Sequence, residues 1–216
     1  MNHSQFTATG PRRLASLGLG LLLAIGISAE AAALPASPQD SVRSLYQTLL
    51  ATMKDARTLG ESGRYARLAP VVVRVFDIPL MARLSIGPSW SGLNEAQRQK
   101  ATQSYGRYIS AVYADRFDSY DGQRFVVNGE QPASFGVLVE SHIIKANGEP
   151  VKVDYIMRRN GENWLIGDIY LDGAISEVAT RRSEFATILR NDGVDGLIAA
   201  LNRKADMLTG TTARAF

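Results

Sequence analysis

The 216-residue sequence contains no cysteine and only two histidines, His3 and His142. The lack of cysteine excludes disulfide frameworks, Cys-ligated zinc, iron–sulfur clusters and thiol catalysis. A metal site of two or three histidines is excluded too, because His3 lies in a segment that we expect to be removed from the chain. His142 falls inside an expected strand, where a lone histidine is more often structural or superficial than catalytic.

The sequence also lacks the short motifs of common catalytic and nucleotide-binding sites. It contains no G-x-S-x-G, no H-E-x-x-H and no Walker-type phosphate loop. The formal net charge is only +3, and no run of Lys and Arg is interleaved with aromatic residues. We therefore predict no metal, no cofactor and no nucleic-acid partner.

The first 33 residues have the pattern of a secretory signal peptide. Arg12 and Arg13 precede an uncharged apolar run over residues 14–27, and small residues at A-x-A spacing follow at 29–33. The apolar run is too short for a comfortable membrane span, although an uncleaved anchor helix is the alternative. We expect residues 1–33 to direct export.

The N-terminal half of the remaining chain has helical periodicity. Ser37 or Asp40 is suited to cap a first helix, and Asn94-x-x-Gln97 matches a capping box that opens the longest one. The apolar spacing predicts helices that end near 60–63, cover about 65–75 and 76–87, and run from Asn94 to about Tyr120.

From residue 122 the pattern changes to strands. Asn-Gly pairs at 128–129, 147–148 and 160–161 separate runs of alternating apolar residues, which is typical of hairpins. Two closing helices follow, on either side of Gly193. This order predicts an α+β fold, a curled four-stranded antiparallel meander covered by N-terminal and C-terminal helices (a cystatin-like roll). We expect one domain over 34–208 and a flexible tail over 209–216.

Two aspartates in the expected strands are candidates for a buried carboxylate. Alternation places Asp154 on the more polar face, near Lys152 or Arg158, which argues against a buried general base. Asp168 has apolar neighbours on both faces, so we expect it to be partly buried and paired, with Arg158 as the candidate partner. A cavity enzyme that uses Asp168 and Tyr155 is one alternative function. Asp172 is expected to shape a strand-to-helix turn with Gly173.

A container is the other interpretation of the same strands. The meander has one strongly apolar face, several helices are available to cover it, and Met53, Met81 and Met157 are flexible enough to adapt to variable ligands. A cavity between sheet and helices would be mostly apolar with few polar groups at its rim. The residue pattern alone does not separate such a cavity from an ordinary core.

Four segments in order resemble the MlaC family, also called the toluene-tolerance family, of periplasmic ABC-transporter auxiliary proteins. They are "FDIPLMARLSIGPSW" (76–90), "SYGRYISAVYADRFDSY" (104–120), "VKVDYIMRRNGENWLIGDIYLDGAIS" (151–176) and "RSEFATILRNDGVDGLIAALNRK" (182–204). The third segment is the most specific, with Val-Asp-Tyr, then Trp and Asp, then an acidic-Gly-x-x-Ser end. The family often has Glu-Gly where this chain has Asp172-Gly173.

The resemblance implies a lipid carrier rather than an enzyme. It implies an apolar cavity for lipid tails and transfer between an outer-membrane lipoprotein complex and an inner-membrane ABC transporter with an MCE-domain protein. The ligand is a phospholipid or, as in the hopanoid-associated HpnM branch, a polycyclic lipid. A transporter adaptor that binds no lipid is a further alternative. The residues expected to contact lipid tails are Phe76, Leu80, Tyr108, Val112, Val137, Val139, Tyr155, Met157 and Ile169.

Overall fold

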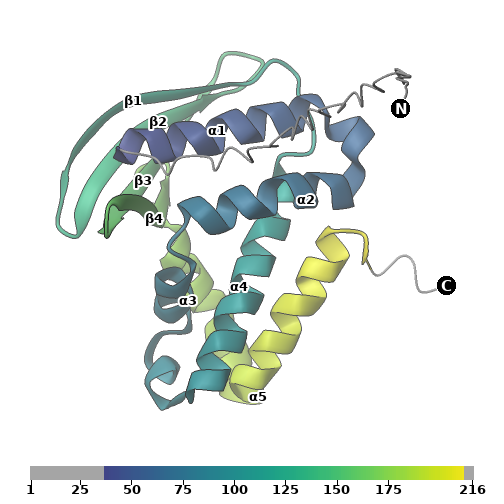
Figure 1. Ribbon diagram of the computed structural model, residues 1–216, viewed down its shortest axis with the longest axis vertical. Helices are drawn as coiled ribbons and strands as arrows, with labels where there is room; N and C mark the ends of the chain where they lie inside the picture. The colour runs from purple at the N-terminus through teal and green to yellow at the C-terminus, as the bar shows by residue number, and fades with distance from the viewer. Residues whose placement is uncertain (1–36, 212–216) are drawn as a thin grey trace, which may run out of the picture. The chain divides into compact units, whose positions relative to one another are not determined.

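The computed structural model describes residues 37–211, which form five α-helices and a five-stranded antiparallel sheet (Figure 1). The expected signal peptide and the last five residues of the expected tail lie outside the described residues. The α+β class and the antiparallel meander are confirmed, with one short additional strand.

The first two helices follow each other with little interruption. α1 (Pro38–Lys54) begins at Ser37, whose side chain accepts a hydrogen bond from the Asp40 amide at 3.1 Å. α2 (Ala56–Val75) starts directly after Asp55, so the predicted helix end at residues 60–63 is wrong. Gly60, with φ of 61°, instead makes a kink inside α2, because glycine adopts a left-handed backbone without steric cost.

The third helix is capped by Asp77, and the fourth begins where its predicted capping box lies. α3 (Ile78–Ile86) is followed by the 3-10 helix η1 (Gly87–Gly92). α4 (Glu95–Arg116) opens with the reciprocal capping box between Asn94 and Gln97. It ends at Arg116 rather than near Tyr120, because Phe117 leaves the helical conformation; the ring of Phe117 lies tilted towards that of Phe125 in the sheet, with 6.0 Å between the ring centroids.

The strands run in sequence order across the sheet. They are β1 (Arg124–Ala133), β2 (Gly136–Ile144), β3 (Pro150–Asn160), β4 (Asn163–Leu171) and β5 (Ile175–Ser176). The Asn-Gly turns at 147–148 and 160–161 fall between strands as predicted. The third predicted turn is wrong: Asn128 is a bulge within β1, which continues to Ala133, and the chain reverses at residues 134–135.

A second bulge lies in β4 at Gly167. Ile156 pairs with Asp168 while Met157 pairs with Ile166, so Gly167 has no partner across the ladder. The extra residue places Ile166 and Ile169 on the same buried face and turns Asp168 to the other face. The sequence prediction that Ile166 and Asp168 share one face of the strand is therefore wrong, because regular alternation is interrupted at Gly167.

α1 covers one face of the sheet, and the other helices pack on each other beside it (Figure 1). α1 lies along the sheet. The ring centroids of Tyr46 and Tyr155 are 5.9 Å apart, and the Tyr46 hydroxyl is hydrogen-bonded to the Ser141 hydroxyl at 2.6 Å. α5 (Glu177–Leu208) packs against α4 and α3 and is broken at Gly193, which confirms the two expected closing helices. Asp172 and Gly173 both have positive φ and form the turn between β4 and β5.

Candidate functional site

The pocket that best fits a ligand site has a volume of about 540 Å³ and lies on the sheet face away from α1. Ile156 and Arg158 of β3 point to this face, because they alternate with Tyr155 and Met157, which are buried in the core. α3 and the β1–β2 turn supply the other walls. The lining residues are Leu80, Arg83, Leu84, Ala133, Ser134, Phe135, Ile156, Arg158, Gly167, Asp168 and Tyr170.

The β1–β2 turn forms one wall because Gly136 holds it against the sheet. Gly136 has φ of 144°, and a Cβ atom at this position would overlap the carbonyl oxygen of Met157. Only glycine permits this close approach. The turn consequently presents Phe135 at the rim of the pocket with 82% of its surface exposed.

The Gly167 bulge sets the floor. A Cβ atom at Gly167 would lie 3.1 Å from Cδ of Arg158 and 3.3 Å from Cδ2 of Leu80. The missing side chain lets the α3 leucine and the arginine stem close together over the bulge. Gly167 thus lies where apolar Leu80 and charged Arg158 meet at the edge of the pocket.

Two arginines provide the positive charge of the pocket. Within residues 37–211, Arg83 has no carboxylate within 4.0 Å, and Arg158 has only Asp77 at that limit. The side chain of Arg158 is 43% exposed. The long separation and the exposure make this a weak ion pair, so both guanidinium groups retain unused hydrogen-bond donors.

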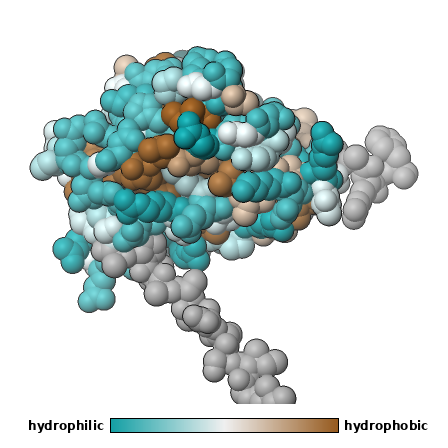
Figure 2. Space-filling model, turned by 90° about the horizontal axis from the view of Figure 1, so that it is seen from above, coloured by the Kyte–Doolittle hydropathy of each residue, from teal (hydrophilic) through white to brown (hydrophobic). Residues whose placement is uncertain are grey.

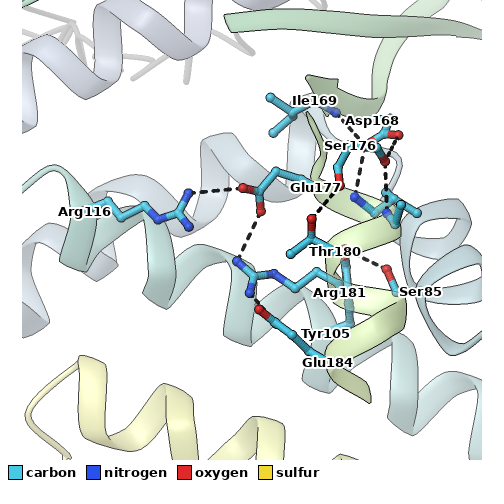
Figure 3. Close-up of polar contacts among 12 residues, drawn as sticks. Ser85, Tyr105, Arg116, Asp168, Ile169, Ser176, Glu177, Thr180, Arg181 and Glu184 are labelled. Atoms are coloured by element: carbon cyan, nitrogen blue, oxygen red, sulfur yellow. Dashed lines mark hydrogen bonds and ion pairs between the residues drawn. The ribbon is translucent and has the colours of Figure 1, made fainter. Parts of the chain in front are cut away.

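The carboxylate of Asp168 accepts hydrogen bonds from residues at and near the start of α5 (Figure 3). Oδ1 accepts hydrogen bonds from the amides of Ile169 at 2.7 Å and Val178 at 3.1 Å. Oδ2 accepts from the Ser176 hydroxyl at 2.6 Å, and Ser176 in turn caps the Ala179 amide. Asp168 is partly buried as predicted, but its expected partner Arg158 is wrong.

Asp168 and Tyr155, the two residues of the predicted alternative in which the protein is a cavity enzyme, lie on opposite faces of the sheet. Tyr155 lies on the α1 side of the sheet, 2% exposed, whereas Asp168 lies on the pocket side. Burial raises the pKa of Tyr155 well above its ordinary value, so the phenol stays protonated. These positions do not form a joint acid–base site.

Asp154 is more deeply buried than the sequence indicates. It is 3% exposed, and among residues 37–211 only Lys152 forms an ion pair with it, with Nζ at 3.2 Å from Oδ2. Lys152 was predicted as its neighbour, whereas the depth of its burial was not predicted. Oδ1 of Asp154 has no hydrogen-bond partner within the described residues.

A cluster of charges fastens α4 to α5 beside the pocket (Figure 3). Glu177 contacts Arg116 at 3.6 Å and Arg181 at 3.2 Å, and Arg181 also contacts Glu184 at 2.6 Å. Arg181 is only 8% exposed in its side chain and lies 5.5 Å from the ring centre of Tyr108. We assign this cluster to helix packing.

Of the nine residues predicted to contact lipid, only Leu80 lines this pocket. Six others are buried in the core, and two are partly buried against it. The buried six are Phe76, Tyr108, Val139, Tyr155, Met157 and Ile169; the partly buried two are Val112 and Val137. Sequence reasoning missed Arg83, Phe135, Ile156, Arg158 and Tyr170, although the alternation of Ile156 with Arg158 marks a face that is both apolar and charged.

A smaller hollow lies between α1 and β1. It has a volume of about 280 Å³ and is lined by Arg43, Tyr46, Gln47, Leu50, Phe125 and Val127. Figure 2 looks onto the side of the molecule that carries α1 and β1, and shows apolar side chains gathered within a hydrophilic surround. The ring centroids of Tyr46 and Phe125 lie 4.8 Å apart across this hollow. The space left for a ligand is therefore smaller than in the pocket beside α3.

The described part of the chain lacks two further kinds of site. Residues 37–211 contain no group of three or more acidic or histidine side chains placed to hold a metal ion. No helix in this range is long and apolar enough to cross a membrane.

The fold and the pocket together define a class of protein, an α+β module that offers a small ligand a mainly apolar site with a few polar groups. More particularly, the chain belongs to the MlaC family, whose model, described as "MlaC protein", matches residues 43–203.

The chain is also similar to two known proteins. The intermembrane phospholipid transport system binding protein MlaC of Haemophilus influenzae is 23% identical over 125 residues, which is 56% of this chain and 58% of that protein. The match therefore spans less than two thirds of the relative's length. The structure of a phospholipid-binding protein from Ralstonia solanacearum, in complex with a phospholipid, superposes with a TM-score of 0.69 at 24% identity, over 80% of this chain and 99% of that one. At this identity the likeness supports the fold.

Proposed function

We propose that the protein is a periplasmic lipid carrier that holds lipid tails in the pocket between α3, the β1–β2 turn and the sheet. The observation that carries this proposal is a pocket of about 540 Å³ whose floor and walls are mainly apolar and whose arginines come from two different elements. The volume falls within the range of about 300–1,000 Å³ that is typical of small-ligand sites. Membership of the MlaC family and the phospholipid bound to the structural relative agree with this choice.

The physical task of such a carrier is to shield tails from water. Transfer of each methylene group from the bilayer to water costs about 0.8 kcal/mol of free energy. A phospholipid therefore leaves a bilayer slowly without a carrier. A pocket lined by Leu80, Leu84 and Ile156 replaces part of the bilayer contact and needs no chemical step. Release of the lipid then requires a partner that binds more tightly to a protein conformation with low affinity for the lipid.

Eight of the nine residues predicted from the sequence to contact lipid lie outside this pocket, and six of the eight are buried in the core. Phe76, Val139, Tyr155 and Met157 are at most 2% exposed, so a tail reaches them only if helices move away from the sheet. We propose such an opening for a lipid with two long tails, with the observed pocket as the point of entry. Ligands often remodel a site in this way.

The route and the partners follow from the family. The Haemophilus relative is named as part of an intermembrane phospholipid transport system, and we infer the same role for this chain. The partners would be an outer-membrane lipoprotein complex and an inner-membrane ABC transporter with an MCE-domain protein. We further propose that residues 1–33 are removed on export and that residues 34–208 act as the carrier domain.

A transfer assay tests the carrier proposal. Donor vesicles with a fluorescent phospholipid and acceptor vesicles without it are mixed, with and without the purified chain that starts at Leu34. A carrier increases transfer in proportion to its concentration. An adaptor that binds no lipid leaves the rate unchanged, and a cavity enzyme instead produces a chemically altered lipid, which chromatography of the same samples detects.

A further inference from the structure

We propose that the surface around the mouth of the pocket docks the protein directly onto an anionic lipid bilayer. This surface combines apolar and arginine side chains from α3, η1, the β1–β2 turn, β3 and α5, and we call it the docking rim. Its members are Arg83, Leu84, Trp90, Phe135, Arg158 and Arg182. The proposal rests on the carrier function for its choice of partner, and it adds a contact that is separate from the binding of a lipid tail.

The docking rim is continuous because two hollows share a wall. The pocket and a neighbouring hollow of about 470 Å³ are both lined by Arg83 and Leu84 of α3. From this wall the pocket extends to Phe135, and the neighbouring hollow extends to Trp90 and Arg182. The mouth of the pocket therefore lies within the surface that we expect to face the bilayer.

The charge of the docking rim is positive. The residues that line the two hollows include three arginines and a single carboxylate, Asp168, which already accepts hydrogen bonds from two amides and a hydroxyl. Within residues 37–211, Arg83 and Arg182 have no carboxylate within 4.0 Å, and Arg158 has only Asp77 at that limit. The fold leaves these cations unneutralised, so charge complementarity favours an anionic partner.

The apolar part of the docking rim projects from the molecule. Phe135 is 82% exposed, more than any other large apolar side chain of the described residues, and Leu84 beside it is 39% exposed. Gly136 fixes the turn against the backbone of Met157, so the phenylalanine ring is held outward at the rim. Exposed Phe and Leu side chains next to arginines are typical of surfaces that enter the head-group region of a bilayer.

The same positive charge also attracts an acidic protein, but the shape of the docking rim favours a bilayer. A protein partner needs a matching pocket for the projecting Phe135 ring, whereas acyl chains adapt to it. Guanidinium groups form two hydrogen bonds at once with phosphate oxygens, which are present across the whole bilayer surface. Docking in this orientation also brings the mouth of the pocket to the membrane, so a tail enters without crossing bulk water.

A vesicle flotation assay measures docking separately from lipid loading. The same purified chain as in the transfer assay is mixed with vesicles of dioleoyl-phosphatidylcholine, either alone or with an equal amount of dioleoyl-phosphatidylglycerol. The fraction of protein that floats with the vesicles in a density gradient gives the affinity. We expect roughly ten-fold tighter binding to the mixed vesicles. Salt at about 1 M should remove most of this difference, because it screens the arginines.

Substitutions in the docking rim have matched controls on the same protein. Phe135→Ser should weaken binding to the mixed vesicles roughly ten-fold, because the ring no longer enters the bilayer. Arg83→Gln and Arg182→Gln should each weaken it roughly five-fold. Met207→Ser and Arg203→Gln remove an exposed apolar side chain and an exposed charge near the C-terminal end of α5, outside the docking rim, and should bind as the unmodified protein does.

The variant Ile156→Trp distinguishes docking from loading, because it fills the pocket and leaves the docking rim unchanged. We expect it to float with the mixed vesicles as the unmodified protein does, although it carries less lipid. Loss of its flotation would overturn the proposal, and so would equal binding of the unmodified protein to neutral and mixed vesicles.

The remaining outcomes separate docking from the carrier function. Lipid transfer without flotation on either kind of vesicle overturns docking and leaves the carrier function intact. Retention on immobilised polyglutamate without flotation assigns the docking rim to an acidic protein and also overturns the proposal. Flotation that depends on Phe135 and Arg83, together with no lipid transfer, supports docking and overturns the carrier function.

Discussion

At the residue scale, two glycines without side chains shape the pocket. Gly136 allows the β1–β2 turn to touch the backbone of Met157, and Gly167 allows Leu80 and Arg158 to meet above a bulge. Both are places where a methyl group would displace a neighbour that the pocket needs. Neither role is visible in the sequence, where both residues look like ordinary strand glycines.

Gly136→Ala should destabilise the fold strongly. The new Cβ would overlap a backbone carbonyl oxygen, and φ of 144° is unfavourable for alanine, so we expect a loss of about 3 kcal/mol or more in the free energy of unfolding. Gly129→Ala is the matched control in the same hairpin, because its Cβ would meet nothing within 4 Å. Equal unfolding midpoints in guanidinium for the two variants would contradict this account of the turn.

Asp168→Asn tests whether this carboxylate is structural. The variant keeps the shape but loses the charge at the start of α5, so we expect it to cost about 1–2 kcal/mol of stability. Asp172→Asn, in the turn that follows, is the control and should change stability by less than about 0.5 kcal/mol, because asparagine tolerates positive φ. Chemical denaturation measures both, and an unchanged stability for Asp168→Asn would reopen a functional role.

At the element scale, the two faces of β3 have different tasks. Tyr155 and Met157 pack against the helices, whereas Ile156 and Arg158 line the pocket. The interpretation of this strand as a container wall stays a prediction, and the pocket in the structure lies on the opposite face from the one predicted to contact lipid.

A pair of tryptophan substitutions distinguishes the two faces. Ile156→Trp fills part of the pocket and should lower lipid loading roughly five-fold with the fold preserved, because its present side chain is only partly buried. Val139→Trp adds volume at a fully buried position and should instead cost at least about 1–3 kcal/mol of stability. Loading is measured by lipid extraction and stability by thermal unfolding. The reverse pattern would show that tails occupy the α1 side of the sheet.

The sequence predicted elements well and their local irregularities poorly. The capping residues Ser37 and Asn94 marked helix starts correctly, because a cap is a short-range contact between residues three positions apart. The Asn-Gly pair at 128–129 did not make a turn, since the same residues also suit a bulge and the choice depends on pairing with β2. The pocket depends on the bulge at Gly167 and on contacts between α3 and β4, which are distant in sequence.

At the scale of the whole molecule, five tyrosines lie in the core or pack against it. Burial raises the pKa of Tyr46, Tyr105, Tyr108, Tyr113 and Tyr155, in the case of Tyr105 to about 12. These residues come from α1, α4 and β3, so their burial reports on the packing of helices against the sheet and against each other.

The alkaline stability of the protein should reflect this packing. A folded-state pKa above the unfolded value of about 10 stabilises the fold fully below pH 10, and this contribution is lost as the pH rises towards 12. We expect the tyrosinate absorbance at pH 11 to be smaller in buffer than in guanidinium, and Tyr105→Phe to reduce the difference. Equal absorbance in the two solvents, with the fold intact by circular dichroism, would contradict the packing described here.

The central claim is that this member of the MlaC family binds a lipid in the pocket lined by Leu80, Ile156 and Arg158. The most direct measurement is lipid mass spectrometry of an organic extract of the purified protein, with the Ile156→Trp variant purified in parallel. The account predicts a phospholipid in the extract of the unmodified protein and several-fold less in that of the variant. An extract without lipid, together with no uptake from vesicles, would contradict it.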